Sequence, residues 1–506
     1  MNNDLMKQYE GKLPRPLIEQ VIKGAEEEKL TKAQIEKVFL KLEEKYKYSK
    51  IQPGEAIGII TAESFGEPGT QMSLDYEEKV IVRSGNQIKM IKIGELIDNV
   101  MNTLGSTKIK NETEIFDLKE MELFVPAISN NEKIDWRKVT QLSRHTAPEK
   151  LLKLVTRSGR SITATPFHSF VIRKDNQVLP VAGSSLIKGD RIPCVKNLRN
   201  DIQNQYLNLK EYLSPQEYIF ESELRKAINN EEASIPITSY EQINNYRQGR
   251  NIHQLQQNCV YSFQNHSEAI IPELLPLDED FGFLVGAYLA EGSCSKYRVG
   301  ISNISPEYRV RISEFAKKYN INSSVNYDIG EYGESITLDL NSKVLSDLLY
   351  KTCSKLAQNK FVPDFAFTAN KKFLKGLLQA YFDGDGNISV DRKMIRVSSS
   401  SKELRDGIAI LLSEMGIFTT KSIAKKEQFT LIIPHKYATL FAEKISCTIP
   451  KKKEKLLQLT SIPFADKRYD VLDMIPGINS ILSEIGKKLS IPTRYTHKFT
   501  KKQKNS

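Results

Sequence analysis

Cysteine is scarce in this 506-residue chain, and no two of its five cysteines form a CxxC pair. Their wide spacing argues against a zinc ribbon and against a disulfide framework, so we expect reduced and mostly buried thiols. No apolar run approaches the roughly 20 residues that a membrane-spanning helix needs. The first residues lack the apolar core and the cleavage site of a signal peptide. We therefore expect a cytoplasmic protein without a membrane partner.

The residues that are abundant indicate a folded, multidomain protein. Apolar residues make up 40% of the chain and aromatic residues 8%, which excludes wholesale disorder, and the length suffices for several folding units. The net charge of +11 and the pI near 9.0 suit a polyanionic partner. A solvated basic surface explains the same charge, so the motifs must decide between the two.

Residues 1–72 are predicted to form an α-helical segment. A capping box of Thr31 and Gln34 opens a helix. This helix places four apolar residues on one face: Ile35, Val38, Phe39 and Leu42. Small and apolar residues predict a further helix within residues 53–65. A short segment with such an apolar stripe is expected to pack against a larger partner.

Beyond Ser73 the sequence pattern changes from helix to β-strand. Short β-type runs surround a turn at Ser84-Gly85-Asn86. Pattern and composition divide the rest of the chain into four regions: a β-rich region at 73–197, an Asn- and Gln-rich linker or accessory region at 198–277, a mixed α/β region at 278–450, and a basic helical tail at 451–506.

One sequence element occurs twice, about 90 residues apart. "FLVGAYLAEGS" and "LLQAYFDGDGN" each predict an apolar helix that ends in an acidic residue followed by glycine. Small residues recur four apart in both helices, at Gly286 and Ala290 and at Gly376, Ala380 and Gly384. This spacing lets two helices approach closely. Packed together, the helices would bring Glu291 and Asp385 side by side.

Two carboxylates at this point are unfavourable unless a cation bridges them. Each lies at the negative end of a helix dipole, and the two charges repel each other. Carboxylate oxygens next to phosphate oxygens favour Mg²⁺, so we expect Mg²⁺ as cofactor with Glu291 and Asp385 as metal ligands. The alternative is two buried helices with glycine C-caps and exposed acids. The repetition favours the metal site.

The two segments resemble the paired motifs of LAGLIDADG homing endonucleases of the dodecapeptide type found inside inteins. Glu291 and Asp385 fall at the acidic position of the motif. "KFVPDF" matches the block before the second helix, which makes Lys360 the expected active-site lysine. The resemblance implies an α/β fold with pseudo-two-fold symmetry that hydrolyses both strands of double-stranded DNA with bound metal. Glu291 stands where the family often has Asp.

In the light of that resemblance, the change at Ser73 is a splice junction. "SLDYEEKVIV" is similar to the first block of an intein, and "GRSITATPFHSFVI" resembles the Thr-x-x-His block, with Thr165 and His168. The resemblance implies an all-β Hint-type splicing domain whose N-terminal half is residues 73–197. Ser73 would be the catalytic nucleophile that attacks the carbonyl of Met72. His168 would protonate the departing nitrogen, and Thr165 would hydrogen-bond the amide.

The segment before the junction resembles a third family. "PGEAIGIITAESFGEPGTQM" is close to the trigger-loop region of the A″ polypeptide, the C-terminal fragment of the archaeal RNA polymerase largest subunit. The resemblance implies a component of a nucleotidyltransferase that works only after splicing. Its partners would be A′ and the rest of the polymerase core, through residues 1–72.

The end of the chain departs from the intein pattern. Its last residues do not match the strand-rich block and the terminal His-Asn of an intein, so we expect the intein C-terminus and the rest of A″ to be absent. Three functions then compete: a polymerase component, an active DNA endonuclease, and a non-catalytic relic that binds DNA. A separate C-terminal intein half would make the chain one part of a trans-splicing pair.

Overall fold

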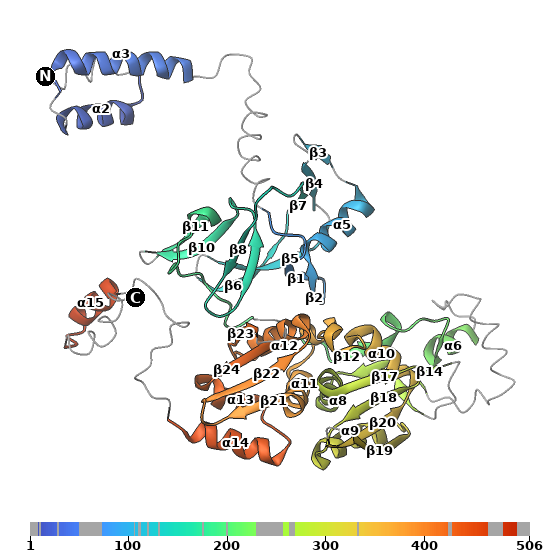
Figure 1. Ribbon diagram of the computed structural model, residues 1–506. Coiled ribbons are helices and arrows are strands. Elements are labelled where there is room, and N and C mark those ends of the chain that lie inside the picture. The colour runs from blue at the N-terminus through green and yellow to red at the C-terminus, as the bar shows by residue number, and fades with distance from the viewer. Residues whose placement is uncertain are drawn as a thin grey trace. The chain divides into compact units, whose positions relative to one another are not determined.

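The computed structural model in Figure 1 describes most of the chain, in two compact units, Met1–Gln71 and Met72–Ser506. The second unit contains both groups of candidate site residues. The described residues are Tyr9 and 12–27, 30–49, 73–105, 107–109, 113–118, 121–129, 132–174, 177–198, 201–228, 257–262, 269–330, 333–423, 428–463 and 479–492.

The described part of the first unit consists of helices α2 (Arg15–Glu27) and α3 (Lys32–Ser49). One half of the predicted capping box forms at the start of α3, while the Gln34 N–H donates to the Thr31 carbonyl oxygen instead of its hydroxyl. The Gln34 side chain accepts hydrogen bonds from the backbone N–H and from the hydroxyl of Thr31, both at 2.8 Å. These bonds satisfy groups that a helix N-terminus leaves without a partner, which is why the helix begins there.

The apolar face of α3 is buried in part. Phe39 is fully buried and stacks on Tyr9, with 4.6 Å between the ring centroids. Val38, expected on the same face, is 41% exposed. The helix predicted within residues 53–65 lies outside the described residues.

The predicted hairpin after Ser73 is present. Strand β1 (Lys79–Ser84) pairs antiparallel with β2 (Gln87–Lys92). Gly85 in the turn has φ +53°, a left-handed conformation that glycine adopts without strain. With β5 (Phe124–Ile128) and β6 (Ile134–Lys138) the hairpin forms a four-stranded sheet in the order β2-β1-β5-β6.

Smaller sheets account for the other described strands of this β-rich region. They are a three-stranded sheet of β3 (Thr107–Ile109), β4 (Thr113–Asp117) and β7 (Gln141–Arg144), and two hairpins, β8 (Leu152–Val155) with β9 (Ser161–Ala164) and β10 (Ser169–Lys174) with β11 (Gln177–Ala182). A two-stranded sheet is only marginally stable by itself, so these hairpins depend on their neighbours.

The expectation that this region is all-β is wrong in one element. Helix α5 (Ile93–Leu104) follows β2 directly and packs Ile97 and Met101 into a small core with Val82. Its apolar residues are spaced three and four apart, the period of a helix. Apolar residues continue past Lys92, the last residue of β2, to Ile93, and this continuation concealed the change of period.

The mixed α/β region contains the same order of elements twice: helix, two strands, helix, two strands, helix. The first copy is α8 (Glu279–Glu291), β17 (Gly292–Ser295), β18 (Arg298–Ser302), α9 (Pro306–Lys318), β19 (Ser323–Gly330), β20 (Gly333–Asn341) and α10 (Lys343–Cys353). The second is α11 (Lys371–Gly384), β21 (Gly386–Ser389), β22 (Met394–Ser399), α12 (Lys402–Glu414), β23 (Thr420–Ile423), β24 (Phe429–Pro434) and α13 (Ala438–Lys444). The sheets have matching strand orders, β17-β18-β20-β19 and β21-β22-β24-β23.

Helices α8 and α11 lie side by side between the two sheets (Figure 1). Glycines make this approach possible. A Cβ atom on Gly282 or Gly286 would lie 2.1 Å from a backbone carbonyl oxygen of α11, and one on Gly376 would lie 2.0 Å from a carbonyl oxygen of α8. No side chain fits at such distances, so the backbones themselves are in contact. The predicted close packing of the two helices is therefore observed.

Both helices begin at a side-chain cap. The carboxylate of Asp278 accepts a hydrogen bond of 2.9 Å from the backbone N–H of Phe281. Asn370 accepts bonds from the N–H groups of Lys372 and Phe373, at 2.9 and 3.2 Å. These caps fix where each helix starts, and the helix length then determines where its acidic end lies.

Residues on both sides of 278–450 pack into the same core as the repeat. Before it, this holds for described strands within 201–277: β12 (Tyr206–Asn208), β13 (Tyr218–Phe220), β14 (Cys259–Ser262), β15 (Ile271–Pro272) and β16 (Leu274–Pro276). Helix α6 (Glu221–Ile228) packs Leu224 into a separate small cluster with Cys259 and Tyr261. After it, α14 (Pro450–Ser461) buries Leu456 and Leu459. The core thus extends beyond the boundaries expected from the sequence. Helix α15 (Asn479–Lys488) follows.

We predict that Gly286→Ala destabilises the second unit by roughly 1–3 kcal/mol, because its Cβ forces the α8 and α11 backbones apart. Urea unfolding measures the change. Gly24→Ala is the matched control, since nothing lies within 4 Å of a Cβ on that helical glycine. An unaltered unfolding midpoint for Gly286→Ala would contradict the backbone contact.

Candidate functional site

Ser73 is held by Thr165 through two backbone contacts. The Ser73 N–H donates to the Thr165 hydroxyl at 3.0 Å, and the Thr165 N–H donates to the Ser73 carbonyl oxygen at 2.9 Å. An isolated bridge joins the next residue, Leu74, to Ala164. The backbone on both sides of the Ser73 side chain is therefore fixed, and the Thr165 hydroxyl lies at the nitrogen of the Met72–Ser73 peptide bond.

His145 contacts the Ser73 side chain, although no sequence pattern predicted it. Its Nε2 lies 2.6 Å from Ser73 Oγ, and its Nδ1 lies 2.7 Å from the Thr146 carbonyl oxygen. None of the motifs quoted above includes His145. The available signal was that the chain has only six histidines, of which His145 lies in the same β-rich region as His168.

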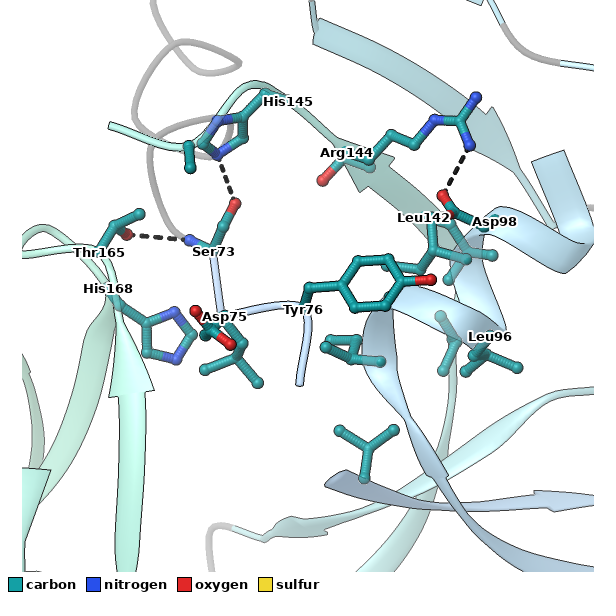
Figure 2. Close-up of a pocket in the computed structure, with 18 of the residues that line it drawn as sticks. Ser73, Asp75, Tyr76, Leu96, Asp98, Leu142, Arg144, His145, Thr165 and His168 are labelled. Carbon is teal, nitrogen blue, oxygen red and sulfur yellow. Dashed lines mark hydrogen bonds and ion pairs between the residues drawn. The ribbon is translucent and has the colours of Figure 1, made fainter. Parts of the chain in front are cut away.

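His168 lies on the other side of Ser73 from His145 (Figure 2). A turn in which its N–H donates to the Thr165 carbonyl at 3.0 Å places it there. Its ring meets Phe170 edge-on, 5.2 Å between centroids. The structure thus brings together the three residues that the sequence proposed for splicing and adds a second histidine.

Ser73, His145, Thr165 and His168 line one end of a cavity of about 570 Å³. The rest of its wall is mostly aliphatic and comes from the strands, α5 and residues next to the strands: Val80, Val82, Ile93, Leu96, Ile97, Leu123, Val125, Val139 and Leu142. The cavity is therefore mostly apolar, with further polar residues in its wall at Asp75, Asp98, Gln141, Ser143 and Arg144.

Arg144 anchors the strand end that carries His145. Its guanidinium donates to Asp98 of α5 at 2.7 Å and forms an ion pair with Glu114 of β4. The register of the β4–β7 pair places Glu114 directly opposite Arg144. Two elements therefore fix the position of the neighbouring histidine.

The second group of site residues lies at the ends of α8 and α11. Glu291 is the last residue of α8, and Asp385 directly follows α11. A Cβ built on Gly384 would lie 3.5 Å from the Glu291 side chain, so that carboxylate reaches the end of the partner helix. The predicted neighbourhood of Glu291 and Asp385 is present.

Burial and mutual repulsion disfavour ionisation of these carboxylates. Burial, together with the negative charge of Glu291, raises the pKa of Asp385 to about 7. Burial also raises the pKa of Glu291, while a hydrogen bond of 2.6 Å from the Asn303 amide opposes the rise. A bound cation would therefore favour the ionised forms, which burial alone disfavours.

Buried Lys360 and half-buried Lys452 cover the C-terminal ends of the two helices. Lys360 Nζ donates to the carbonyl oxygens of Tyr288 and Gly292, at 2.6 and 2.8 Å. Lys452 Nζ donates in the same way to Phe382 and Gly384, at 3.1 and 3.0 Å. Burial lowers the pKa of both ammonium groups, while the nearby carboxylates oppose the change.

Lys452 is a second candidate active-site lysine that the sequence pattern did not reveal. It lies on α14, which was assigned to the tail because of its run of lysines. Its contacts match those of Lys360 one repeat earlier. A lysine after the second helix, at a position corresponding to Lys360, was the signal that could have identified it.

Within the described ranges, no three His, Cys, Asp or Glu side chains gather as a metal site. Glu291 and Asp385 offer hard oxygen ligands of the kind that Mg²⁺ takes, and Mg²⁺ usually keeps several waters or phosphate oxygens besides one or two carboxylates. The two carboxylates therefore fit such an ion. In the same ranges, no helix has the length and hydropathy to cross a membrane.

Models of two known families match separate ranges of the chain. The model of the LAGLIDADG-like domain matches residues 372–446, and that of RNA polymerase Rpb1, domain 5, matches residues 11–274, more than half of the chain. The DNA-directed RNA polymerase subunit Rpo1C of Methanocaldococcus jannaschii is 41% identical over 459 residues, which are 91% of this chain and 49% of that protein. The chain thus spans about half of this relative.

Solved structures include similar chains of two kinds. The transcription factor IIB Mvu mini-intein is 32% identical over 26% of this chain and 72% of its own, with a TM-score of 0.24. A variant of the homing endonuclease I-DmoI is 14% identical over 36% of this chain and 98% of its own, with a TM-score of 0.30. Both TM-scores are below 0.5, so the assignment depends on the sequence matches. The chain belongs to the RNA polymerase Rpb1 domain 5 family, and its residues 372–446 match the LAGLIDADG-like domain.

Proposed function

We propose that this chain cuts double-stranded DNA with Mg²⁺ bound by Glu291 and Asp385, and that it activates its own Met72–Ser73 bond for splicing. The observation that carries the first activity is the glycine contact between α8 and α11, which brings the two carboxylates together. The observation that carries the second is the pair of hydrogen bonds that holds Ser73 against Thr165.

Each part of the endonuclease site has a role in phosphodiester hydrolysis. Mg²⁺ would polarise the phosphate and stabilise the attacking and leaving oxygens. Glu291 and Asp385 would hold the ion, and the Asn303 amide orients the Glu291 carboxylate. Lys360 and Lys452 place positive charge next to the carboxylates, where it stabilises the negative charge that develops on the phosphate. Their lowered pKa values also let them release a proton more readily than ordinary lysines do.

We propose further that the two repeats are related by a pseudo-two-fold axis between α8 and α11. The matching strand orders and the matching contacts of Lys360 and Lys452 support this relation. Such an axis would present one half-site to each DNA strand, which suits a double-strand cut. A relic that binds DNA without cutting it is the alternative, since Glu291 is longer than the aspartate frequent at its position.

The first splicing step would convert the Met72–Ser73 amide into an ester. Ser73 Oγ attacks the Met72 carbonyl carbon, and the peptide nitrogen leaves as the amino group of Ser73. The Thr165 hydroxyl accepts a hydrogen bond from the N–H of that amide and fixes the orientation of the amide. His168, in the same cavity, protonates the departing nitrogen.

We propose that the apolar wall beside Ser73 binds a C-terminal intein segment that supplies the remaining splicing residues. An apolar cavity of about 570 Å³ next to the nucleophile suits a strand with alternating apolar side chains. The relative Rpo1C is about twice as long as the part that this chain spans. After splicing, residues 1–72 would join the polymerase and contact A′ and the rest of the core, and only then would nucleotidyl transfer be possible.

The endonuclease is tested with the intein-free A″ gene as substrate. Asp385→Asn and Glu291→Gln should each abolish Mg²⁺-dependent cutting but leave DNA binding intact, because binding depends on phosphate contacts by basic side chains. Lys360→Ala and Lys452→Ala should slow cutting by about 10-fold or more. The exposed Glu443→Gln is the control and should cut normally. Full cutting by Asp385→Asn would remove that residue from the site.

The stability of the metal-free chain should change with pH through Asp385. The pKa of the folded carboxyl, about 7, lies above the ordinary value of 3.8, so its ionisation costs stability as the pH rises from about 4 to about 7. Asp385→Asn should therefore be more stable than the unmodified chain by a few kcal/mol at pH 8 in EDTA, but nearly equal at pH 4. Urea midpoints at the two pH values measure this, and equal gains at both would contradict the shift.

The splicing step is tested by trapping the ester. Hydroxylamine should release, slowly, a fragment that ends at Met72, and Ser73→Ala should prevent the release because it lacks the nucleophile. Mass spectrometry identifies the fragment. A ligated product lacking residues 73 onward from this chain alone would contradict the need for a C-terminal segment.

A further inference from the structure

We propose that His145 is the general base that removes the proton from Ser73 Oγ, an inference that rests on the proposed splicing step. The contact that leads to it is the 2.6 Å distance between Ser73 Oγ and His145 Nε2. This is within the range for a hydrogen bond through which a proton is transferred. His145 touches the reacting atom itself, which makes it a candidate catalytic residue.

The second nitrogen of the ring determines which way the proton moves. His145 Nδ1 lies 2.7 Å from the carbonyl oxygen of Thr146, and a carbonyl oxygen can only accept a hydrogen bond. Nδ1 therefore carries the hydrogen in the neutral ring, and Nε2 presents a lone pair to Ser73 Oγ. This tautomer accepts the hydroxyl proton and then holds it as the imidazolium, whose Nδ1 still donates to Thr146.

Both partners of the contact are held in place before reaction. Ser73 is fixed by its two hydrogen bonds with Thr165. His145 directly follows Arg144, whose guanidinium contacts Asp98 and Glu114. An arrangement fixed from both sides lowers the entropy cost of bringing base and nucleophile together.

His145 then accepts one proton, and His168 donates another. The Ser73 Oγ proton moves to His145 Nε2 as the bond from Oγ to the Met72 carbonyl carbon forms. The C–N bond breaks, and the nitrogen takes a proton from His168. The products are an ester between Met72 and Ser73 Oγ and a free amino group on Ser73. One histidine gains the proton that the other loses, and exchange with water restores both.

A serine nucleophile needs this base more than a cysteine does. A hydroxyl is almost entirely protonated at neutral pH, whereas a thiol with a pKa of about 8.5 supplies a few per cent of thiolate by itself. The loss of His145 should therefore matter much less when residue 73 is cysteine. A histidine that merely supports the fold would matter equally in both cases.

The test compares His145→Gln in the full chain with Ser73 and in the full chain with Ser73→Cys. The readout is the rate at which saturating hydroxylamine releases the fragment ending at Met72. We expect a loss of about 100-fold or more in the serine background and less than about 10-fold in the cysteine background. His435→Gln, whose histidine lies in the endonuclease region and contacts Leu459, is the matched control and should release at the normal rate.

The outcomes distinguish a wrong assignment of His145 from a wrong assignment of the splicing step. Equal losses in the two backgrounds, or no loss with serine, overturn the assignment of His145 while the splicing step stands. No release from either the unmodified chain or Ser73→Cys overturns the splicing step itself and the assignment with it. DNA cleavage by the same preparations shows that the His145→Gln variants are folded.

Discussion

The backbone contact between α8 and α11 is the feature on which the proposed endonuclease site depends. At Gly282, Gly286 and Gly376 a carbonyl oxygen of the opposite helix occupies the place of a Cβ atom. With the helices this close, the acidic residues that end them must be neighbours. Aromatic side chains surround the contact, and the Tyr308 hydroxyl, deep in the core, donates to the Ala380 carbonyl of α11 at 3.0 Å. The site is therefore built on rigid elements and not on loops.

The same contact creates an electrostatic cost. Glu291 and Asp385 are partly desolvated, repel each other, and lie at the negative ends of two helices. Lys360 and Lys452 offset part of this cost because each covers the carbonyl groups at one helix end. The lysines are themselves desolvated, which lowers their pKa values. Burial of each of these four charged groups is unfavourable. A bound cation would stabilise the two carboxylates, and a phosphate would stabilise the two lysine ammonium groups.

The β-rich region at 73–197 packs against the mixed α/β region. Ile88, from the hairpin that follows Ser73, is only 1% exposed and belongs to the main hydrophobic core. At a second contact, the Arg160 guanidinium donates to the Thr419 carbonyl at 2.9 Å, and the Lys421 N–H donates to the Ser158 carbonyl at 2.8 Å. Arg160 directly precedes β9, whose last residue is the neighbour of Thr165. Contacts with the main core therefore stabilise the strands around Ser73, in addition to the pairing within their own small sheets.

The sequence predicted the features that depend on residues close together in the chain. The repeat predicted the helix pair and its carboxylates because four-residue spacing and a terminal acid lie within one helix. His145 and Lys452 were missed because their partners lie 72 and about 70 residues away in the sequence. Strands β13 and β14 were missed because they are short and lie among Asn- and Gln-rich residues, although Tyr218 and Val260 are buried in the core. Helix α5 was missed because apolar residues continue past the end of β2 into it.

If the α8–α11 contact makes Glu291 and Asp385 one cation-binding unit, the contributions of the two carboxylates to metal affinity must be coupled. A double-mutant cycle of Mn²⁺ affinity, measured by electron paramagnetic resonance on the unmodified chain, Glu291→Gln, Asp385→Asn and the double variant, tests it most directly. We expect strong coupling: either substitution removes most of the affinity, and the second adds little. Independent, additive losses, or affinity that neither substitution changes, would contradict it.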